Sequence, residues 1–165
     1  GTRNGKSIRF SEEQIRPSGR KTMGVKGITL SSEDDRLVGM LLIKREGTTV
    51  LVATEKGFGK RTEISQYRAQ KRGGKGVLTM KTTDKVGKMV TIKEVVDKDD
   101  LMIITNQGVL IRQPVSQIRA IGRATQGVKL IKLGEGTLVS SITRIMTEED
   151  SGDDNNNTEP KGNTE

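Results

Sequence analysis

Three stretches of the chain, beginning at Gly5, Gly57 and Gly108, repeat one another without a gap. Their starts lie 52 and 51 residues apart. A period near 50 residues is typical of propellers and other repeat proteins, in which each unit packs mainly against its neighbours. The chain is therefore expected to fold as a row of similar units. The shared positions are Gly5/Gly57/Gly108, Arg9/Arg61/Arg112, Gln14/Gln66/Gln117, Arg16/Arg68/Arg119, Arg20/Arg72/Arg123, Gly24/Gly76/Gly127 and Val25/Val77/Val128, with Thr2/Thr54/Thr105 upstream.

Each unit is expected to supply about four short strands, which is the pattern of one propeller blade. Residues 50–54 and 101–105 are apolar and β-branched, and a three-residue turn ending in glycine follows each of them. Such a turn between two strand patterns predicts a hairpin. No stretch of helical length shows a 3.6-residue period. The remaining strands are expected at 25–30, 77–82 and 128–133, and at 36–43, 88–95 and 137–145.

Composition limits both the core and the chemistry of the chain. The sequence is 31% hydrophobic and only 2% aromatic, so the core has to be built from aliphatic side chains. It contains no cysteine and no histidine, which excludes disulfides, thiolate catalysis, histidine bases and zinc sites of the Cys/His type. No nucleophile–base pair and no metal cluster is visible, and we expect neither a catalytic nor a metal-binding residue. No run of residues is long and apolar enough to cross a bilayer.

Charge divides the chain into two parts. Residues 147–165 carry seven acids and one base, and they have almost no apolar side chains, so we expect an acidic disordered tail there. Residues 1–146 carry 28 bases and 14 acids, and we expect them to form the folded domain. A basic body with an acidic tail is common in proteins that bind a polyanion. A basic surface without a partner is the alternative.

The peptide QKRGGKG at residues 70–76 is the most distinctive stretch of the sequence. Its three bases can approach phosphate oxygens, and its three glycines let the backbone come close to a ligand. It is not a Walker loop, because the spacing of that motif is absent. A flexible corner between strands, where the turn itself requires glycine, explains the same peptide equally well.

The repeat extends this pattern to all three units. The segments aligned with 70–76 are SGRKTMG and IGRATQG, and each keeps an arginine at the third place. Equivalent residues of successive blades lie along one rim, so we expect a spaced basic track of Arg20, Arg72 and Arg123, joined by Lys21, Lys26, Lys71 and Lys75. The final glycine of each segment is expected to be structural, and the shared glutamines are expected to hydrogen-bond within the loops. Two roles stay open for the arginines that follow the hairpin turns: they lie on the rim, or they are structural and pair with acids or stack on neighbouring blades. These arginines are Arg9, Arg61 and Arg112.

The chain resembles the C-terminal domain of the DNA gyrase A subunit. That domain carries a box written roughly as QRRGGKG, and residues 70–76 match it at six of seven positions, with Lys71 in place of the first arginine. The resemblance extends over most of residues 2–146. It is carried also by GFGKRT, GVKGI, VLIR and GRATQGVKLI, and by the acidic end of the chain.

This resemblance implies an all-β fold, a β-pinwheel of six four-stranded blades that exchange strands, of which this chain supplies about three. It implies a module that binds and wraps duplex DNA in support of ATP-dependent negative supercoiling in bacterial cytoplasm. The implied partners are the gyrase B subunit together with the remainder of the gyrase A subunit, whereas ATP and magnesium are used elsewhere in the enzyme. The implied DNA-binding residues are Arg20, Lys21, Lys26, Gln70, Lys71, Arg72, Gly73, Gly74, Lys75, Gly76 and Arg123.

The position of the box departs from the family pattern. In the family the functional box belongs to the first blade, whereas the first unit here has SGRKTMG at that place. Thr2, the counterpart of Thr54, follows a single residue, so we expect a fragment that matches the C-terminal half of a pinwheel. Two alternatives remain, a protein-interaction propeller with a basic rim and the related domain of the topoisomerase IV A subunit.

Overall fold

Antiparallel strands make up the fold in the computed structural model, which describes residues 1–146. The expected tail at 147–165 lies outside the described residues. No helix of residues 1–146 is long and apolar enough to span a membrane. The strands are β1 (Lys6–Ser7), β2 (Thr49–Thr54), β3 (Phe58–Glu63), β4 (Val77–Leu78), β5 (Met89–Val95), β6 (Asp100–Thr105), β7 (Leu110–Pro114), β8 (Val128–Lys129) and β9 (Val139–Ile145). The short 3₁₀ turns are η1 (Glu12–Gln14), η2 (Ile64–Gln66) and η3 (Val115–Gln117).

The middle sheet is a complete four-stranded blade with the order β5-β2-β3-β8. Its fourth strand, β8, comes from the third unit and pairs with the second unit's β3 through Phe58–Lys129 and Gly59–Val128. The first unit receives a strand in the same way, because β4 of the second unit pairs with β1. The second and third units therefore each lend a strand to the unit before them, as the resemblance implied.

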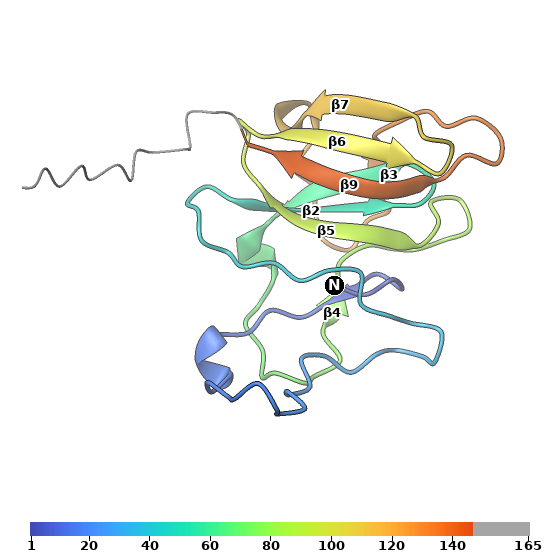
Figure 1. The fold of residues 1–165 in the computed structure, drawn as a ribbon. Coiled ribbons are helices and arrows are strands. Elements are labelled where there is room, and N and C mark those ends of the chain that lie inside the picture. The colour runs from blue at the N-terminus through green and yellow to red at the C-terminus, as the bar shows by residue number, and fades with distance from the viewer. Residues whose placement is uncertain (147–165) are drawn as a thin grey trace, which may run out of the picture.

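The core lies on both sides of β2, whose six residues are all buried. Successive side chains of a strand point to opposite faces. Leu51 and Ala53 accordingly pack against β6 and β9 of the third unit, while Val50 and Val52 pack with residues such as Met80 and Ile92. Figure 1 shows the resulting arrangement, with the sheets lying one above the other. The aliphatic core expected from the composition is confirmed.

Two of the expected strands are absent. Residues 25–30 have no strand, and residues 36–43 contain only the isolated bridge of Leu37 with Thr2. A strand needs a hydrogen-bonding partner, and the structure pairs neither segment with a neighbouring strand. Leu37, Met40, Leu42 and Ile43 are consequently exposed. The first and third sheets have two and three strands, so only the middle one reaches the expected four.

The hairpin turns form where the sequence predicts them. The amide of Gly57 donates to the carbonyl of Thr54, and Gly5 and Gly108 donate in the same way to Thr2 and Thr105, each at 3.1 Å. All three glycines have φ near +80°, a conformation that other residues adopt only with strain. The repeated threonine and glycine thus build one turn three times.

Candidate nucleic-acid interface

Nearly all of the net positive charge of residues 1–146 lies in three connecting segments. Residues 14–30, 64–82 and 115–133 follow the hairpin strand of each unit and together carry thirteen bases and no acid. The net charge of residues 1–146 is +14, so the rest of this body is close to neutral. The bases are Arg16, Arg20, Lys21 and Lys26 in the first unit, Arg68, Lys71, Arg72, Lys75 and Lys81 in the second, and Arg119, Arg123, Lys129 and Lys132 in the third.

Residues 70–76 lie directly against the first segment. The amide of Gly73 donates to the carbonyl of Gly27 at 2.8 Å, and the amide of Thr29 donates to Gly74 at 2.8 Å. Because of these contacts, the box of the second unit and residues 26–29 of the first form one surface, at the bottom of Figure 1. The side chains of Lys26, Lys71 and Lys75 are exposed there.

The arginine at the third position of the box binds the backbone of the preceding unit. The Arg72 guanidinium donates to the carbonyl of Lys26 at 2.7 Å. Arg123 repeats this contact one unit later with the carbonyl of Leu78, which is the aligned residue. These two side chains hold neighbouring segments together and keep their charge at the surface. Arg20 is exposed and makes no hydrogen bond or ion pair within residues 1–146.

Gln70 occupies the start of the box as a packing residue. The backbone amide of Gln70 donates to the backbone carbonyl of Arg9 at 2.8 Å. The backbone carbonyl of Gln70 accepts from the side-chain amide of Gln14. The side-chain oxygen of Gln14 also accepts from the amide of Arg72 at 2.8 Å, and Gln66 repeats that bond to Arg123 at 3.0 Å. The expectation that the shared glutamines hydrogen-bond within the loops is confirmed for these two.

The first repeated arginine lies between units rather than on the rim. Arg9 donates to the carbonyl of Tyr67 at 3.1 Å, and the Nε of Arg61 donates to the aligned carbonyl of Ile118 at 2.6 Å. Arg61 also pairs with Asp97. Arg112 pairs with Asp100 of its own sheet, with 2.7 Å between Nε and the carboxylate. All three arginines therefore take the structural role left open by the sequence, Arg9 and Arg61 between units and Arg61 and Arg112 in pairs with acids.

Another repeated arginine is exposed to solvent in all three units. Arg16, Arg68 and Arg119 are all exposed, and none of them forms a hydrogen bond or ion pair among the described residues. The basic track expected from the sequence does not contain them. The sequence signal that could have identified these arginines as rim residues is their recurrence in all three units, within segments that lack acids. Lys81 is a further exposed base that the track did not include.

The buried Lys60 side chain hydrogen-bonds the backbone of the third cationic segment, residues 115–133. Its side chain is fully buried, and its ammonium donates to the carbonyls of Gly122 at 2.8 Å, of Arg123, and of Thr125 at 3.4 Å. Burial and the nearby Arg123 guanidinium lower the pKa of Lys60 to about 8. The equivalent position of the first unit is Ile8, an apolar residue below the box.

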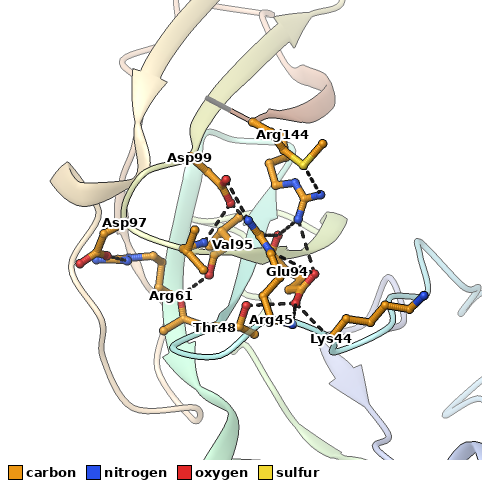
Figure 2. Close-up of polar contacts among 12 residues, drawn as sticks. Lys44, Arg45, Thr48, Arg61, Glu94, Val95, Asp97, Asp99 and Arg144 are labelled. Carbon is orange, nitrogen blue, oxygen red and sulfur yellow. Dashed lines mark hydrogen bonds and ion pairs between the residues drawn. The ribbon is translucent and has the colours of Figure 1, made fainter. Parts of the chain in front are cut away.

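Several acids of residues 1–146 are occupied in an internal network. Figure 2 shows the Arg45 guanidinium between Asp99 and Glu94, and it lies 2.8 Å from the Asp99 carboxylate. Arg144 approaches Glu94 at 3.5 Å. Burial alone would raise the pKa of Glu94, but hydrogen bonds from the amides of Arg45 and Lys44 lower it. The network joins the connection before β2 to β5 and β9, so it stabilises the packing of units and leaves the cationic segments unneutralised.

Other kinds of site are poorly supported by this part of the chain. Residues 1–146 contain no group of three or more histidines, cysteines or carboxylates that could hold a metal ion. An open hollow of about 510 Å³ is lined by Lys56, Lys85 and Lys129 with apolar neighbours such as Phe58 and Leu133. Lys129 lies 5.7 Å from the centre of the Phe58 ring. The hollow is thus another cationic surface.

Comparison with known proteins shows what the repeat is similar to. A match to the family described as "DNA gyrase C-terminal domain, beta-propeller" covers residues 1–44, 48–95 and 99–145. The DNA gyrase A subunit of Staphylococcus epidermidis is 48% identical over 151 residues, which are 91% of this chain and 17% of that protein. The DNA gyrase A subunit of Staphylococcus aureus is 45% identical over 165 residues, 99% of this chain and 18% of that protein. The chain spans less than a fifth of the length of these relatives.

Solved structures show the same architecture. A structure of the DNA gyrase A C-terminal domain matches with a TM-score of 0.75 and 24% identity, over 88% of this chain and 49% of that one. The C-terminal domain of DNA topoisomerase IV matches with a TM-score of 0.82 and 24% identity, over 88% and 45%. At this identity the likeness shows the fold, and it confirms the expected all-β, propeller-like pinwheel.

Proposed function

The chain belongs to the family of DNA gyrase C-terminal domains, and from this membership we propose that it binds duplex DNA along its three cationic segments. The observation that carries the proposal is the separation of charge. Thirteen bases and no acid lie in segments that recur at the same place in every unit. Phosphate contacts by lysine and arginine provide most of the affinity of non-specific DNA binding. The proposed contacts are Arg16, Arg20, Lys21, Lys26, Arg68, Lys71, Arg72, Lys75, Lys81, Arg119 and Arg123, with Gln70, Gly73, Gly74 and Gly76 shaping the box.

Double-stranded DNA suits this surface better than a single strand. Single-strand binders stack the bases on exposed aromatic rings. The chain has three aromatic residues, and Tyr67 is buried with its hydroxyl 2.6 Å from that of Thr79. Flexible lysines and unpaired arginines contact phosphates without reading bases, so binding is proposed to be independent of sequence.

Salt dependence of binding tests the proposal. A duplex of about 40 base pairs is titrated at several salt concentrations, and the slope of log K against log[salt] falls by about 0.9 for each phosphate contact. Replacing Arg16, Arg68 and Arg119 together by glutamine is expected to make the slope shallower by about 2.7. These side chains are exposed and form no hydrogen bond or ion pair among residues 1–146, so the fold should be retained.

A matched control separates specific contacts from total charge. Replacing Arg36, Lys44 and Lys85 by glutamine removes the same charge from exposed positions outside the three segments. This variant is expected to keep most of the wild-type slope, since screening limits the effect of distant charges. Equal slopes for the two triple variants, or a wild-type slope near zero, would contradict the proposed interface.

We also propose that the bound duplex is bent around the units, and that in a longer gyrase chain this wrapping supports negative supercoiling. Successive blades of a propeller present equivalent loops along an arc. A duplex that follows three such loops has to curve, which costs a few kcal/mol per 20–30 base pairs and is offset by the added contacts. The other gyrase subunits and a bacterial cytoplasmic location are part of the same proposal.

A topology assay tests the bending. A closed circular plasmid is relaxed by a type I topoisomerase in the presence of the chain, and the protein is then removed. Wrapping is expected to leave a shift in linking number that grows with the amount of chain. The glutamine variant of Arg16, Arg68 and Arg119 is expected to reduce the shift. Binding without any shift would limit the function to contact with straight DNA.

A further inference from the structure

The loop at residues 121–127 is shaped from the inside by one buried ammonium group. The Lys60 ammonium lies 2.8 Å from the carbonyl oxygen of Gly122 and 3.4 Å from that of Thr125, and it also donates to the carbonyl of Arg123. Among residues 1–146 it is the only hydrogen-bond donor to the Arg123 carbonyl. A further bond of 3.1 Å joins it to the Thr125 hydroxyl. Three carbonyls of the loop therefore point into the protein.

Peptide geometry then sets the direction of three amides. In a trans peptide unit, which is the form throughout residues 1–146, the C=O and N–H groups point in opposite directions. The amides that follow the three carbonyls belong to Arg123, Ala124 and Gln126, so they point away from the ammonium. The Gln66 side chain accepts from the Arg123 amide at 3.0 Å. The amides of Ala124 and Gln126 donate no hydrogen bond among residues 1–146, and both residues are exposed.

The box of the second unit lacks this arrangement. Ile8 stands at the position that aligns with Lys60, and its terminal methyl lies 3.6 Å from where a Cβ on Gly74 would be. The amide of Gly73, which aligns with Ala124, donates to the carbonyl of Gly27 at 2.8 Å. The fold of the repeat therefore does not require a buried ammonium or free outward amides, and the loop at 121–127 has both.

The outward amides suit an anion. Backbone N–H groups directed to one side of a turn bind phosphate and other anions, and they are common phosphate contacts in DNA complexes. The surroundings are cationic, because residues 115–133 contain no acid and carry Arg119 and Arg123 beside the loop. Both sides of this contact, the loop and the strand β3 beneath it, are made of described residues.

We propose that the amides of Ala124 and Gln126 bind one phosphate of duplex DNA, and that Lys60 is the positioning residue that holds them outward. Lys60 is fully buried, so it acts through the loop and touches no phosphate. The inference rests on the duplex binding proposed above, and it adds a contact that the pattern of charged side chains does not predict. A contact through backbone amides reads no base, in agreement with binding that is independent of sequence.

A single introduced thiol tests the role of the ammonium. The chain has no cysteine, so Lys60→Cys carries one thiol, which is alkylated in urea before refolding. Alkylation with 2-bromoethylamine restores an ammonium at the length of lysine, whereas 1-bromopropane gives the same shape ending in a methyl group. The aminoethyl chain is expected to bind the duplex within about twofold of the wild type. The propyl chain is expected to bind about tenfold more weakly, because its loop has to be ordered on binding.

Lys85→Cys with the same propyl group is the matched control. Lys85 is exposed and lies outside the three cationic segments, so this chain loses the same unit of charge from a different place. It is expected to bind within about twofold of the wild type, since salt screens distant charges. Circular dichroism checks that each alkylated chain has refolded.

Amide NMR spectra give a signature that a merely structural lysine would not produce. When the duplex is added to the wild-type chain, the amide protons of Ala124 and Gln126 are expected to move downfield, because a hydrogen bond to a phosphate oxygen deshields them. These two shifts are expected to be lost in the propyl chain and restored in the aminoethyl chain. Shifts in residues 14–30, which belong to another unit, should remain in both.

The outcomes separate this inference from the proposed function. A wild-type chain that does not bind the duplex contradicts the proposed function, and the inference with it. Duplex binding with unmoved amides of Ala124 and Gln126, or equal affinities of the propyl and aminoethyl chains, overturns the inference and leaves the proposed function standing. Where the propyl chain does not refold, the amide shifts of the wild-type chain decide alone.

Discussion

Replacing Gly5 by alanine is expected to lower the free energy of unfolding by about 3–5 kcal/mol. Two costs combine at this position. Gly5 has a φ of +82°, which strains any residue that carries a Cβ. The added Cβ would lie 2.1 Å from the carbonyl oxygen of Met80, a backbone atom of the next unit that cannot rotate away. The strand after the box would have to separate from β1, so the junction between two units is the part that gives way.

Gly108→Ala measures the cost of the positive φ alone, without the clash. Gly108 occupies the same turn with a φ of +78°, but no atom of residues 1–146 lies within 4 Å of the added Cβ. This variant is expected to lose only about 1–2 kcal/mol from backbone strain. Both variants are measured by urea unfolding. Equal losses for the two would show that backbone strain, rather than contact between units, decides the effect.

The sequence predicted the parts of the fold that depend on local chemistry. Threonine before a three-residue turn and glycine at its end predicted the hairpins, and apolar β-branched runs predicted β2 and β6. The strand expected at 25–30 failed for a non-local reason. Its residues are as suitable for a strand as those of β4 and β8, but a strand exists only where another strand binds it. Pattern alone does not reveal whether that partner is present.

The candidate site was predicted at the level of segments rather than side chains. The repeat located the basic loops, but it did not distinguish arginines that bind carbonyls from arginines that face solvent. Arg72 and Arg123, which the sequence places on the rim, also donate to backbone carbonyls of the preceding unit. The expected track does not contain the exposed Arg16, Arg68 and Arg119. All of these residues recur equally, so recurrence could not separate them. The distinction depends on which backbone carbonyl lies within reach.

The repeat did not predict a role for Lys60, because the aligned residues are Ile8 and Ile111. Replacing Lys60 by methionine is expected to lower the free energy of unfolding by about 2–3 kcal/mol near neutral pH. Methionine fills a similar volume but removes the donor to the carbonyl of Arg123, while the carbonyls of Gly122 and Thr125 each keep one other donor. Hydrogen exchange should show the loss first in residues 121–127, where these carbonyls lie. Lys85→Met, at an exposed lysine, is expected to change little.

The pH dependence of this loss identifies the buried ammonium. The folded chain holds the pKa of Lys60 at about 8, below the value of 10.5 that the unfolded chain restores. Between these values the unfolded state binds more protons, so the wild-type free energy of unfolding gains a contribution that rises with pH. Lys60→Met lacks it, and the difference between the two chains should widen from about pH 8 to about pH 10. A difference independent of pH would mean that Lys60 contributes only volume to the loop, and that its charge is solvated in the folded chain.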